Sequence, residues 1–482
     1  MVIRVTMMYY GTMSVEVPYG KEFSRQSRIG LREFCKSLLS YSIYQLLGQT
    51  EAKKYIDILR LARNMGKILA ERRYLDESQV GDTRSPFQHD KDRILHSTAF
   101  RRMQYKTQVY VIHESDLYRT RMTHSLEVAQ IARGLAQQLG ANMDLAEAIA
   151  LAHDVGHAPF GHAGESKLRK LLKPFGLTFE HNVQSYRVVT QLEERYASYP
   201  GLNLTRATRE GIIRHQSYFD NQEDILKSIP ENIREEIAEY LPPSLKQPGL
   251  EAQIVNIADI IAYATHDIED ALTVGLINWD RFEKQVEKLE INFLKQIIGT
   301  YLDAEMKKLT LRMSEPSPEI INKMKIRILS HLIINHLIIQ TGQQTKKNLD
   351  SVGGNNNTLC YAIREQDQYV VAFPPVLEKQ VERLVNDLLY NQVYSDPRVK
   401  LMTVKAERIL DALFDNFMQH PDIMPRITQT RLNIDYTLSL EKRNNNEQTL
   451  LAQVVADYIS GMTDKYAMDT YQLLTQAYEK AL

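Results

Sequence analysis

The sequence predicts a mainly α-helical protein. Strand signals are few and short, whereas apolar residues recur at helical spacing through most of the chain. The helical segments are 123–139, 143–155, 182–197, 206–216, 251–272, 280–312, 318–341, 376–394, 397–419 and 447–480. This pattern indicates a helical core followed by a helical C-terminal region.

Composition limits the class of protein. The 482 residues suffice for two or three domains of ~150 residues each, or for one elaborated helical fold. With 59 basic and 60 acidic residues, the net charge is −1, so global charge makes no case for nucleic acid or an anionic membrane. Cys35 and Cys360 are too few and too far apart for a disulfide framework or a thiolate metal site.

The sequence also lacks the patterns of membrane and secreted proteins. Its most apolar long run, 328–339, is interrupted by polar and histidine residues and is too short to span a bilayer. Residues 1–19 do not combine a basic start with a long apolar run. We expect a soluble, cytoplasmic protein with no membrane partner.

The N-terminal part shows little chemistry. A β-branched and tyrosine-containing start up to Gly20 is followed by a helical pattern from about Gly30 to Gly66. Basic residues then cluster between Asp82 and Gln108. They fit either a phosphate-binding surface or a solvated helix face, and composition alone favours the solvated face.

A histidine opens the helix predicted over 123–139. Thr123 suits the N-cap, and His124 follows it in the first turn. Taken alone, such a histidine is more often a capping or structural residue than a metal ligand. The interpretation of His124 as a metal ligand gains support from the other candidate ligands in the sequence.

The helix predicted over 143–155 ends in a His-Asp pair. Asp144 suits its N-cap, and Gly156 fits the position just past its C-terminus. His153 and Asp154 then lie in the last turn, where neighbouring side chains diverge by about 100°. The pair can share one ion only if further ligands come from elsewhere. An antiparallel pairing with the preceding helix would supply one if the two helices are about equally long.

The densest cluster of chemical groups surrounds this pair. The stretch AHDVGHAPFGHAGE contains three histidines and two carboxylates, with glycines and a proline where the backbone must leave a helix. His157 and His162 suit acid–base chemistry, because imidazole titrates near neutral pH. Glu165 lies one helical turn beyond His162 and could fix its tautomer. The absence of thiolates suits Mn, Mg, Fe, Ni or Zn, any of which can polarise a phosphoryl oxygen.

The helix predicted over 251–272 carries polar residues on an otherwise apolar segment. Asp259, Tyr263 and Asp267 follow one another at steps of four. An exposed polar face is one explanation, but such a face usually carries Lys, Glu or Arg, and none occurs here before Glu269. We therefore favour side chains directed into a polar cavity.

Residues 343–375 contain a strand pattern in the C-terminal half of the chain. Gly353-Gly354 precedes three asparagines, and an alternation of aromatic and aliphatic residues follows. The combination predicts a turn and a small β-hairpin insertion.

These residues resemble a known family. The order His124, His153-Asp154, Asp259 is similar to the H...HD...D signature of HD-domain phosphohydrolases. The resemblance is closer still to the deoxynucleoside triphosphate triphosphohydrolases, namely the bacterial dGTP triphosphohydrolases and the vertebrate SAM- and HD-domain dNTP hydrolase. Matching segments run from about residue 65 to the end: RSPFQHDKDRI, AFRRMQYKTQV, RMTHSLEVA, AHDVGHAPFGHAGE, GLNLT, DIIAYATHDIEDAL and VADYISGMTDKYA.

The resemblance implies a role for each site residue. It implies an HD-domain helical core with a divalent metal ion bound by His124, His153, Asp154 and Asp259, and His162 with Glu165 as the catalytic pair. The implied substrate contacts are Gln108 to the sugar, Arg121 to the α-phosphate, His157 and His181 along the phosphates, and Tyr263 with Asp267 at the deoxyribose 3′-hydroxyl. Residues for the β- and γ-phosphates cannot be matched, and Lys465 is only a candidate.

The implied activity is hydrolysis of a dNTP to a deoxynucleoside and tripolyphosphate. Two alternatives remain. One is an HD phosphohydrolase of another nucleotide class; for a guanosine tetraphosphate hydrolase, however, Glu-Asp would stand where the chain has His157-Ala158. The other is a non-catalytic nucleotide sensor or nucleic-acid binder, although the ligands and His162 are all present.

The resemblance also implies organisation and partners. We expect an N-terminal extension (1–64), an HD-domain phosphohydrolase core (65–345) and a helical C-terminal region with the hairpin insertion (346–482). A homo-oligomer, as tetramer or hexamer, is expected. A dNTP acting as allosteric activator and single-stranded DNA are further expected partners.

Overall fold

The computed structural model describes residues 2–6, 14–18, 69–74, 82–108, 119–215, 229, 231–238, 246–313, 316–352, 359–432, 440 and 443–476. Its contacts divide the chain into two units, Met1–Met65 and Gly66–Leu482. In the first unit, β1 (Val2–Thr6) and β2 (Ser14–Pro18) pair antiparallel, with Val2 opposite Pro18. The helix predicted from Gly30 to Gly66 lies outside the described residues.

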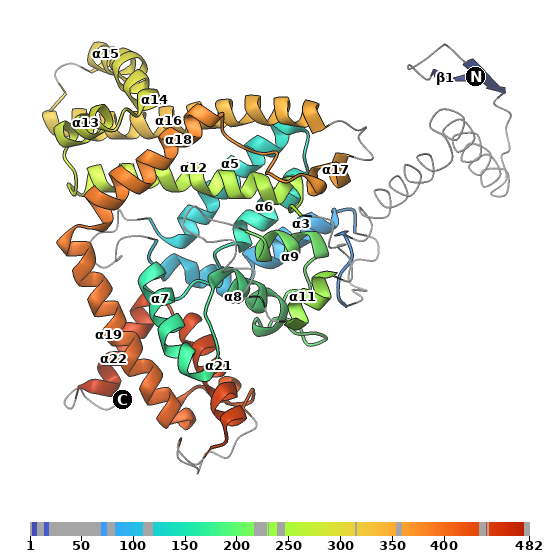
Figure 1. The fold of residues 1–482 in the computed structure, drawn as a ribbon, viewed down its shortest axis with the longest axis vertical. Coiled ribbons are helices and arrows are strands. Elements are labelled where there is room, and N and C mark those ends of the chain that lie inside the picture. The colour runs from blue at the N-terminus through green and yellow to red at the C-terminus, as the bar shows by residue number, and fades with distance from the viewer. Residues whose placement is uncertain are drawn as a thin grey trace. The chain divides into compact units, whose positions relative to one another are not determined.

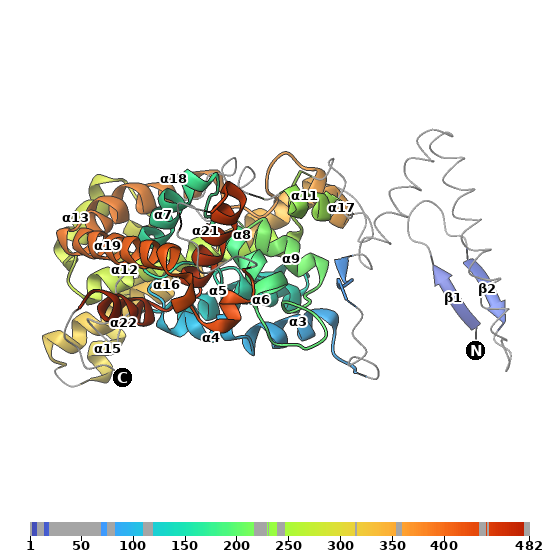
Figure 2. The ribbon, with the colours of Figure 1, turned by 90° about the horizontal axis from the view of Figure 1, so that it is seen from below.

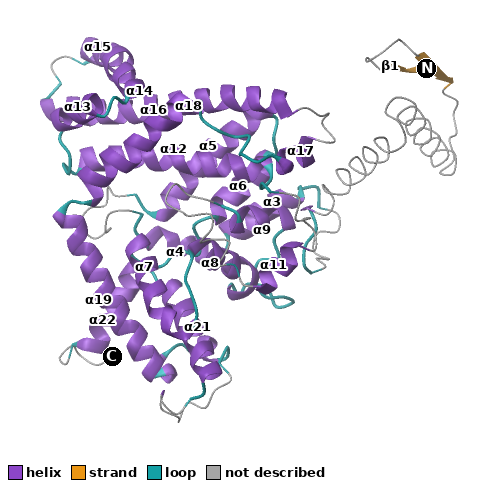
Figure 3. Ribbon diagram, viewed as in Figure 1, coloured by secondary structure: helices purple, strands orange, loops and turns teal. Residues whose placement is uncertain are grey.

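The second unit is built from helices, which confirms the predicted mainly α class (Figure 3). Its first half contains α3 (Pro86–Leu95), α4 (Thr98–Arg102), η2 (Met103–Tyr105), α5 (Arg121–Leu139), α6 (Met143–Ala152), α7 (Gly161–Leu172), η4 (Lys173–Phe175), α8 (His181–Arg187), η5 (Val188–Leu192), α9 (Arg206–Ile213), α11 (Glu231–Ala238) and α12 (Leu250–Thr273). The second half contains α13 (Trp279–Lys288), α14 (Asn292–Gln296), η6 (Ile297–Leu302), α15 (Asp303–Arg312), α16 (Pro318–Val352), α17 (Leu359–Glu365), α18 (Pro375–Glu382), η7 (Arg383–Tyr394), α19 (Pro397–Gln419), η8 (Pro421–Ile423), α20 (Arg426–Gln429), α21 (Asn445–Ser460) and α22 (Asp464–Thr475).

Helix α6 is the centre of the site-bearing half. Seven consecutive or nearly consecutive residues from Leu145 to Ala152 are buried, so α6 is apolar all round and needs neighbours on every side. It packs against α3, α5, α9 and α12, and α5 also packs against α12 (Figure 1). This packing brings one end of α5, the end of α6 and the middle of α12 together.

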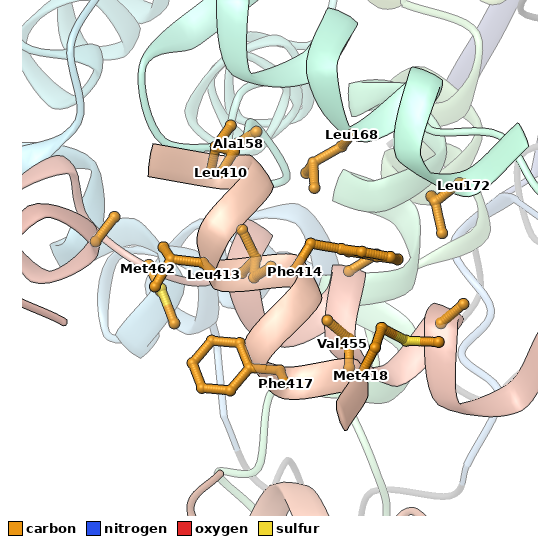
Figure 4. Packing of buried hydrophobic residues seen from close by; sticks show 14 of the residues in the cluster. Ala158, Leu168, Leu172, Leu410, Leu413, Phe414, Phe417, Met418, Val455 and Met462 are labelled. Atoms are coloured by element: carbon orange, nitrogen blue, oxygen red, sulfur yellow. The ribbon is translucent and has the colours of Figure 1, made fainter. Parts of the chain in front are cut away.

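The C-terminal helices pack on the helix that follows the His-Asp pair. Leu168 and Leu172 of α7 share one buried cluster with Leu410 and Phe414 of α19 and with Val455 of α21 (Figure 4). Helix α19 lies beside α21 and α22 in both views (Figures 1 and 2). Residues 66–482 therefore form one unit, and α16 runs across the predicted domain boundary at residues 345 and 346.

Several predicted helix ends differ from the structure. The N-cap of α5 is Thr120, whose side chain accepts from the Thr123 backbone N–H, so Thr123 is the third helical residue. The N-cap of α6 is Asn142 rather than Asp144. Each predicted N-cap lies within one turn of the observed N-cap, and both residues of each pair offer a side-chain oxygen acceptor. The residue types alone therefore could not distinguish them.

Two predicted long helices are interrupted. Segment 280–312 is broken after Leu289, because Glu290 adopts a left-handed backbone conformation (φ 53°). Segment 447–480 breaks after Ser460, and Thr463 then caps α22 by accepting from the Tyr466 backbone N–H.

The predicted β-hairpin insertion at 343–375 is wrong. Helix α16 continues to Val352, α17 follows at Leu359–Glu365, and Gly353-Gly354 lies outside the described residues. The backbone N–H groups of Val370 and Val371 donate to the Gln253 side chain of α12 at 2.8 and 3.2 Å. The first part of the apolar alternation thus lies in α17, and the second part lies in a loop bonded to the Gln253 side chain of α12 instead of to a second strand.

None of the helices that the structure describes is long and apolar enough to cross a membrane.

Candidate active site

Three of the four predicted metal ligands converge from three helices. His124 lies in the first turn of α5, His153 caps the end of α6, and Asp259 lies in the middle of α12. Asp259 Oδ1 lies 2.8 Å from His124 Nε2 and 3.9 Å from His153 Nε2. All three residues are buried, and their ligand atoms lie within 4.8 Å of one another. The antiparallel pairing expected of α5 and α6 therefore does place both histidines at one end.

The geometry around His153 fits a metal ligand. Its Nδ1 lies 2.6 Å from the Ala150 carbonyl oxygen, which fixes the tautomer with the proton on Nδ1. Its Nε2 is buried and has no hydrogen-bond partner. A buried ring nitrogen with a free lone pair beside two carboxylates is the donor that a divalent metal requires.

Asp154, the fourth predicted ligand, lies between His153 on one side and Arg121 and His157 on the other. Its Oδ1 lies 3.3 Å from His153 Nε2 and 3.0 Å from His157 Nδ1. Its Oδ2 accepts from Arg121 Nη1 at 2.8 Å. The carboxylate therefore holds Arg121 and His157 next to the predicted ligands.

The protonation states of these groups suit metal binding. Burial lowers the pKa of His153 to about 4, so its imidazole is neutral at pH 7. Burial alone would raise the pKa of Asp154 and of Asp259, but neighbouring histidines outweigh it and hold both pKa values well below the usual range. Burial alone would lower the pKa of His124, but the hydrogen bond that its ring donates to Asp259 and the charges of Asp259 and Asp154 together raise the pKa, so a metal ion bound there would displace a proton.

His215 belongs to the same cluster and was missed from the sequence. It follows α9, and its Nε2 lies 3.6 Å from Asp259 Oδ2. Its ring centroid is 4.8 Å from that of His153. A lone histidine at the end of a helical segment carries no motif, so only the packing of α9 against α6 reveals it.

Arg121 is a buried cation with unpartnered donor atoms. The residue is 1% exposed, and its Nε and Nη2 have no hydrogen-bond partner. Gln108 Oε1 is likewise buried without a partner. Buried donors and acceptors are normally paired, so these atoms are consistent with a ligand that completes them.

These groups face one small cavity. It is lined by Gln108, Arg121, His124, Asp154, His157, His162, His181, His215, Asp259, Ile260 and Tyr263. Its volume of about 30 Å³ has room for an ion or a water molecule but not for a whole nucleotide. A larger cavity of about 570 Å³, which includes Val155, Gly156 and Tyr458 in its lining, has none of the predicted site residues in its walls.

The predicted catalytic pair, His162 and Glu165, lies within the first turns of α7. His162 is exposed, and its ring centroid is 6.2 Å from that of His157. Glu165 is buried, with Oε2 3.2 Å from His181 Nδ1 and Oε1 accepting from Arg169 at 2.9 Å. Burial alone would raise the pKa of Glu165, but His181 outweighs it and lowers the pKa below the usual range. Glu165 thus orients His181, whose ring lies 4.0 Å from that of His157 between centroids.

The predicted sugar residues lie further along α12. Tyr263 lines the cavity, and Asp267 is buried one turn beyond it. Burial raises the pKa of Asp267 to about 7. Lys465, the candidate for the distal phosphates, is exposed on α22 and is not among the cavity residues.

A histidine at the start of one helix, a His-Asp pair at the end of the next and an aspartate on a third define an HD-domain site. Residues 121–264 match the HD domain family, and residues 371–473 match the phosphohydrolase-associated domain. The chain is thus an HD-domain phosphohydrolase by fold and by site.

Several bacterial proteins are similar over most of this chain. A deoxyguanosinetriphosphate triphosphohydrolase-like protein of Geobacter metallireducens is 41% identical, over 83% of this chain and 91% of the relative. A protein of the same description from Geobacter sulfurreducens is 38% identical, over 90% and 99%. One from Syntrophus aciditrophicus is 38% identical, over 85% and 92%. The chain belongs to this family of deoxyguanosinetriphosphate triphosphohydrolase-like proteins.

Proposed function

We propose that this protein hydrolyses deoxynucleoside triphosphates to a deoxynucleoside and tripolyphosphate. The observation that carries the proposal is a buried carboxylate, Asp154, with an unpartnered atom on each side. On one side lies the unpartnered Nε2 of His153. On the other side Asp154 accepts a hydrogen bond from Arg121, whose Nη2 is unpartnered. One face therefore suits a divalent cation and the adjoining face suits a phosphate. The family membership and the names of the relatives support a nucleoside triphosphate as substrate.

Each residue has a role in the proposed reaction. His124, His153, Asp154 and Asp259 would bind a divalent metal ion, which supplies charge stabilisation for a phosphoryl oxygen and lowers the pKa of water. Arg121 would bind the α-phosphate, and His157 and His181 would lie along the phosphates. Gln108 and Asp267 would bind the sugar, with Tyr263 packed beneath it.

Bond breaking requires a proton donor on the leaving group. In the proposed reaction the oxygen of water bonds to the α-phosphorus and the bond from that phosphorus to the 5′ oxygen breaks. His162 would donate the proton that the 5′ oxygen gains, and the proton that the attacking water loses would pass to bulk solvent. Glu165 acts through His181 by fixing its ring. General acid–base groups of this kind contribute ~10²- to 10⁴-fold to rate.

The test is product analysis. Purified protein is incubated with each dNTP and rNTP in Mn²⁺ or Mg²⁺, in water enriched in ¹⁸O, and the products are separated by chromatography. We expect deoxynucleoside and intact tripolyphosphate, with the label in tripolyphosphate. Orthophosphate with dNDP, pyrophosphate with dNMP, or label in the deoxynucleoside would overturn the reaction.

A matched pair of variants tests the proton donor. His162→Ala is expected to lower kcat by ~10²- to 10⁴-fold with bound metal unchanged. His420→Ala removes an exposed histidine after α19 and is expected to leave kcat unchanged. Equal kcat for wild type and His162→Ala would remove His162 from the mechanism.

A further inference from the structure

Lys106 is a buried lysine that the proposed reaction does not use. It is 2% exposed, and its Nζ donates to the carbonyl oxygens of His157 at 2.6 Å and of Ser460 at 2.7 Å. These partners are 51 and 354 residues away in the chain. Burying an ammonium group is costly, and lysine is almost never fully buried unless it is paired. The cost indicates a role for these two hydrogen bonds.

Both carbonyl groups lie where a structural element ends. Ser460 is the last residue of α21, and the last carbonyls of a helix have no partner within it. His157 follows the turn that carries His153 and Asp154, and its N–H donates to the Asp154 carbonyl oxygen at 3.2 Å. One ammonium group therefore joins the backbone after the His-Asp turn to the C-terminal end of α21.

The backbone of Lys106 contacts a second residue of the site. Its carbonyl oxygen accepts from the backbone N–H of Arg121 at 3.1 Å, and an isolated antiparallel bridge joins Thr107 to Thr120. Lys106 thus bonds to the main chain at Arg121 and at His157. In the proposed reaction the side chains of these two residues meet the phosphates.

Lys106 also lies in the wall of the larger cavity, together with Val155 and Gly156 of the His-Asp turn. A shortened side chain at this position would therefore leave a space beside that cavity. Burial, followed by the charge of Arg121, lowers the pKa of Lys106 to about 7. Its hydrogen bonds are charge-assisted, and so stronger, below this pH.

We propose that Lys106 is a positioning residue for the phosphate-binding face of the site. Its ammonium group fixes the carbonyl of His157, and with it the direction of the His157 ring relative to Arg121. The proposal rests on the proposed function for the role of these two residues as phosphate ligands. It predicts that loss of the ammonium group weakens binding of a polyphosphate and leaves metal affinity unchanged, because its hydrogen bonds go to His157 and Ser460 and not to the four proposed metal ligands.

The experiment measures the dissociation constant Kd of inorganic tripolyphosphate by calorimetry, with manganese-loaded protein below pH 7. Lys106→Met removes the ammonium group and keeps most of the side-chain volume, whereas Lys106→Ala leaves a space beside the larger cavity. Propylammonium, which has the length of the missing side chain, is then added to each variant. Lys405→Met, at an exposed position on α19, is the matched control. Manganese affinity is measured by electron paramagnetic resonance, and circular dichroism and Tm verify folding.

The expected result is a selective and reversible loss. Lys106→Met and Lys106→Ala should each weaken tripolyphosphate binding about 10-fold, as loss of a charge-assisted hydrogen bond does. Manganese affinity should stay within about twofold of the wild type. Propylammonium should restore most of the tripolyphosphate affinity of Lys106→Ala but not of Lys106→Met, whose side chain fills the space. Lys405→Met should bind as the wild type does.

Wild-type tripolyphosphate affinity in Lys106→Met would show that the Lys106 side chain only fills space. Failure of propylammonium to restore Lys106→Ala, equal restoration of both variants, loss of manganese from Lys106→Met, or a wild type that does not bind tripolyphosphate would also overturn the role of Lys106. Because Kd needs no turnover, a failure to release tripolyphosphate from a dNTP would count against the proposed function alone.

Discussion

Asp259 is buried, ionised and placed between two histidines, His124 and His215. Without the carboxylate these rings lose the negative charge that a cation needs beside them. We expect Asp259→Ala to abolish both bound metal and turnover while helical content stays nearly intact. Plasma mass spectrometry of the dialysed protein and circular dichroism measure the two quantities.

An exposed aspartate provides the control for this prediction. Asp469 lies on the solvent side of α22, and Asp469→Ala should keep the metal. If Asp259→Ala retained one metal ion per chain, the ligand assignment would be wrong.

Asp267 gives the site a pH dependence near neutrality. Burial raises its pKa to about 7, so it is an anion above pH 7 and protonated below. Only the anion accepts a charge-assisted hydrogen bond from a sugar hydroxyl, and such bonds are the stronger kind. We expect KM for dGTP to rise by roughly 10-fold between pH 8 and pH 6, in proportion to the loss of the ionised form.

The Asn variant isolates this effect from other titrations. Asp267→Asn cannot ionise, so the part of the pH profile with a midpoint near 7 should disappear from KM. KM profiles that are parallel for Asp267→Asn and wild type would show that another group titrates.

At the scale of elements, Gly156 allows the close approach of the His-Asp turn to α8. A Cβ at this position would lie 2.0 Å from the backbone nitrogen of Ser185. The residue does not have the left-handed conformation expected of a helix-ending glycine, so the short distance, and not backbone φ, requires glycine. The Gly156 N–H also donates to Ser185 Oγ at 2.9 Å.

Two glycine variants should therefore have opposite effects. Gly156→Ala must push α8 away and should lower the free energy of unfolding by about 3 kcal/mol, at the upper end of the usual cost of overpacking. Gly134→Ala, exposed within α5 with nothing near its Cβ, should raise it by up to about 1 kcal/mol. Urea denaturation measures both, and equal stabilities would contradict the close-approach argument.

At the scale of the whole molecule, Asp464 links the C-terminal helices to two walls of the site. Its Oδ2 accepts from the backbone N–H of Thr107 at 2.9 Å, next to Gln108. Its Oδ1 accepts from the N–H of Phe160 at 2.9 Å. Phe160 has φ 64°, a conformation that costs a non-glycine residue roughly 1–2 kcal/mol, and it directly precedes the helix that carries His162.

Removing this carboxylate should disturb the site without touching the metal ligands. Asp464→Ala is expected to lower the free energy of unfolding by about 1–3 kcal/mol, because it leaves buried N–H groups unpaired. It should also lower kcat about 10-fold through misplacement of His162, with metal content unchanged. Asp469→Ala on the same helix should change stability by less than about 0.5 kcal/mol. Wild-type kcat in Asp464→Ala would show that the C-terminal helices do not position the site.

The sequence by itself determined the helical class, the family and most of the residues that the structure gathers at the candidate site. Periodicity is local, so 3.6-residue spacing locates α5, α6 and α12 without knowledge of their packing. The spacing of Asp259, Tyr263 and Asp267 likewise indicated one polar face on an apolar helix. The HD motif order placed His124, His153 and Asp154 in the correct family before any distance was known.

Only the tertiary structure decided which residues meet across large sequence separations. His215 reaches the site because α9 packs against the core, and no local pattern marks this residue. Glu165 contacts His181 because α8 lies against the start of α7, a contact across sixteen residues that local spacing does not show. The loop mistaken for a hairpin satisfies its N–H groups on Gln253, a side chain more than one hundred residues away. Such partners are set by packing, since hydrogen-bond satisfaction depends on what is near in space and not in sequence.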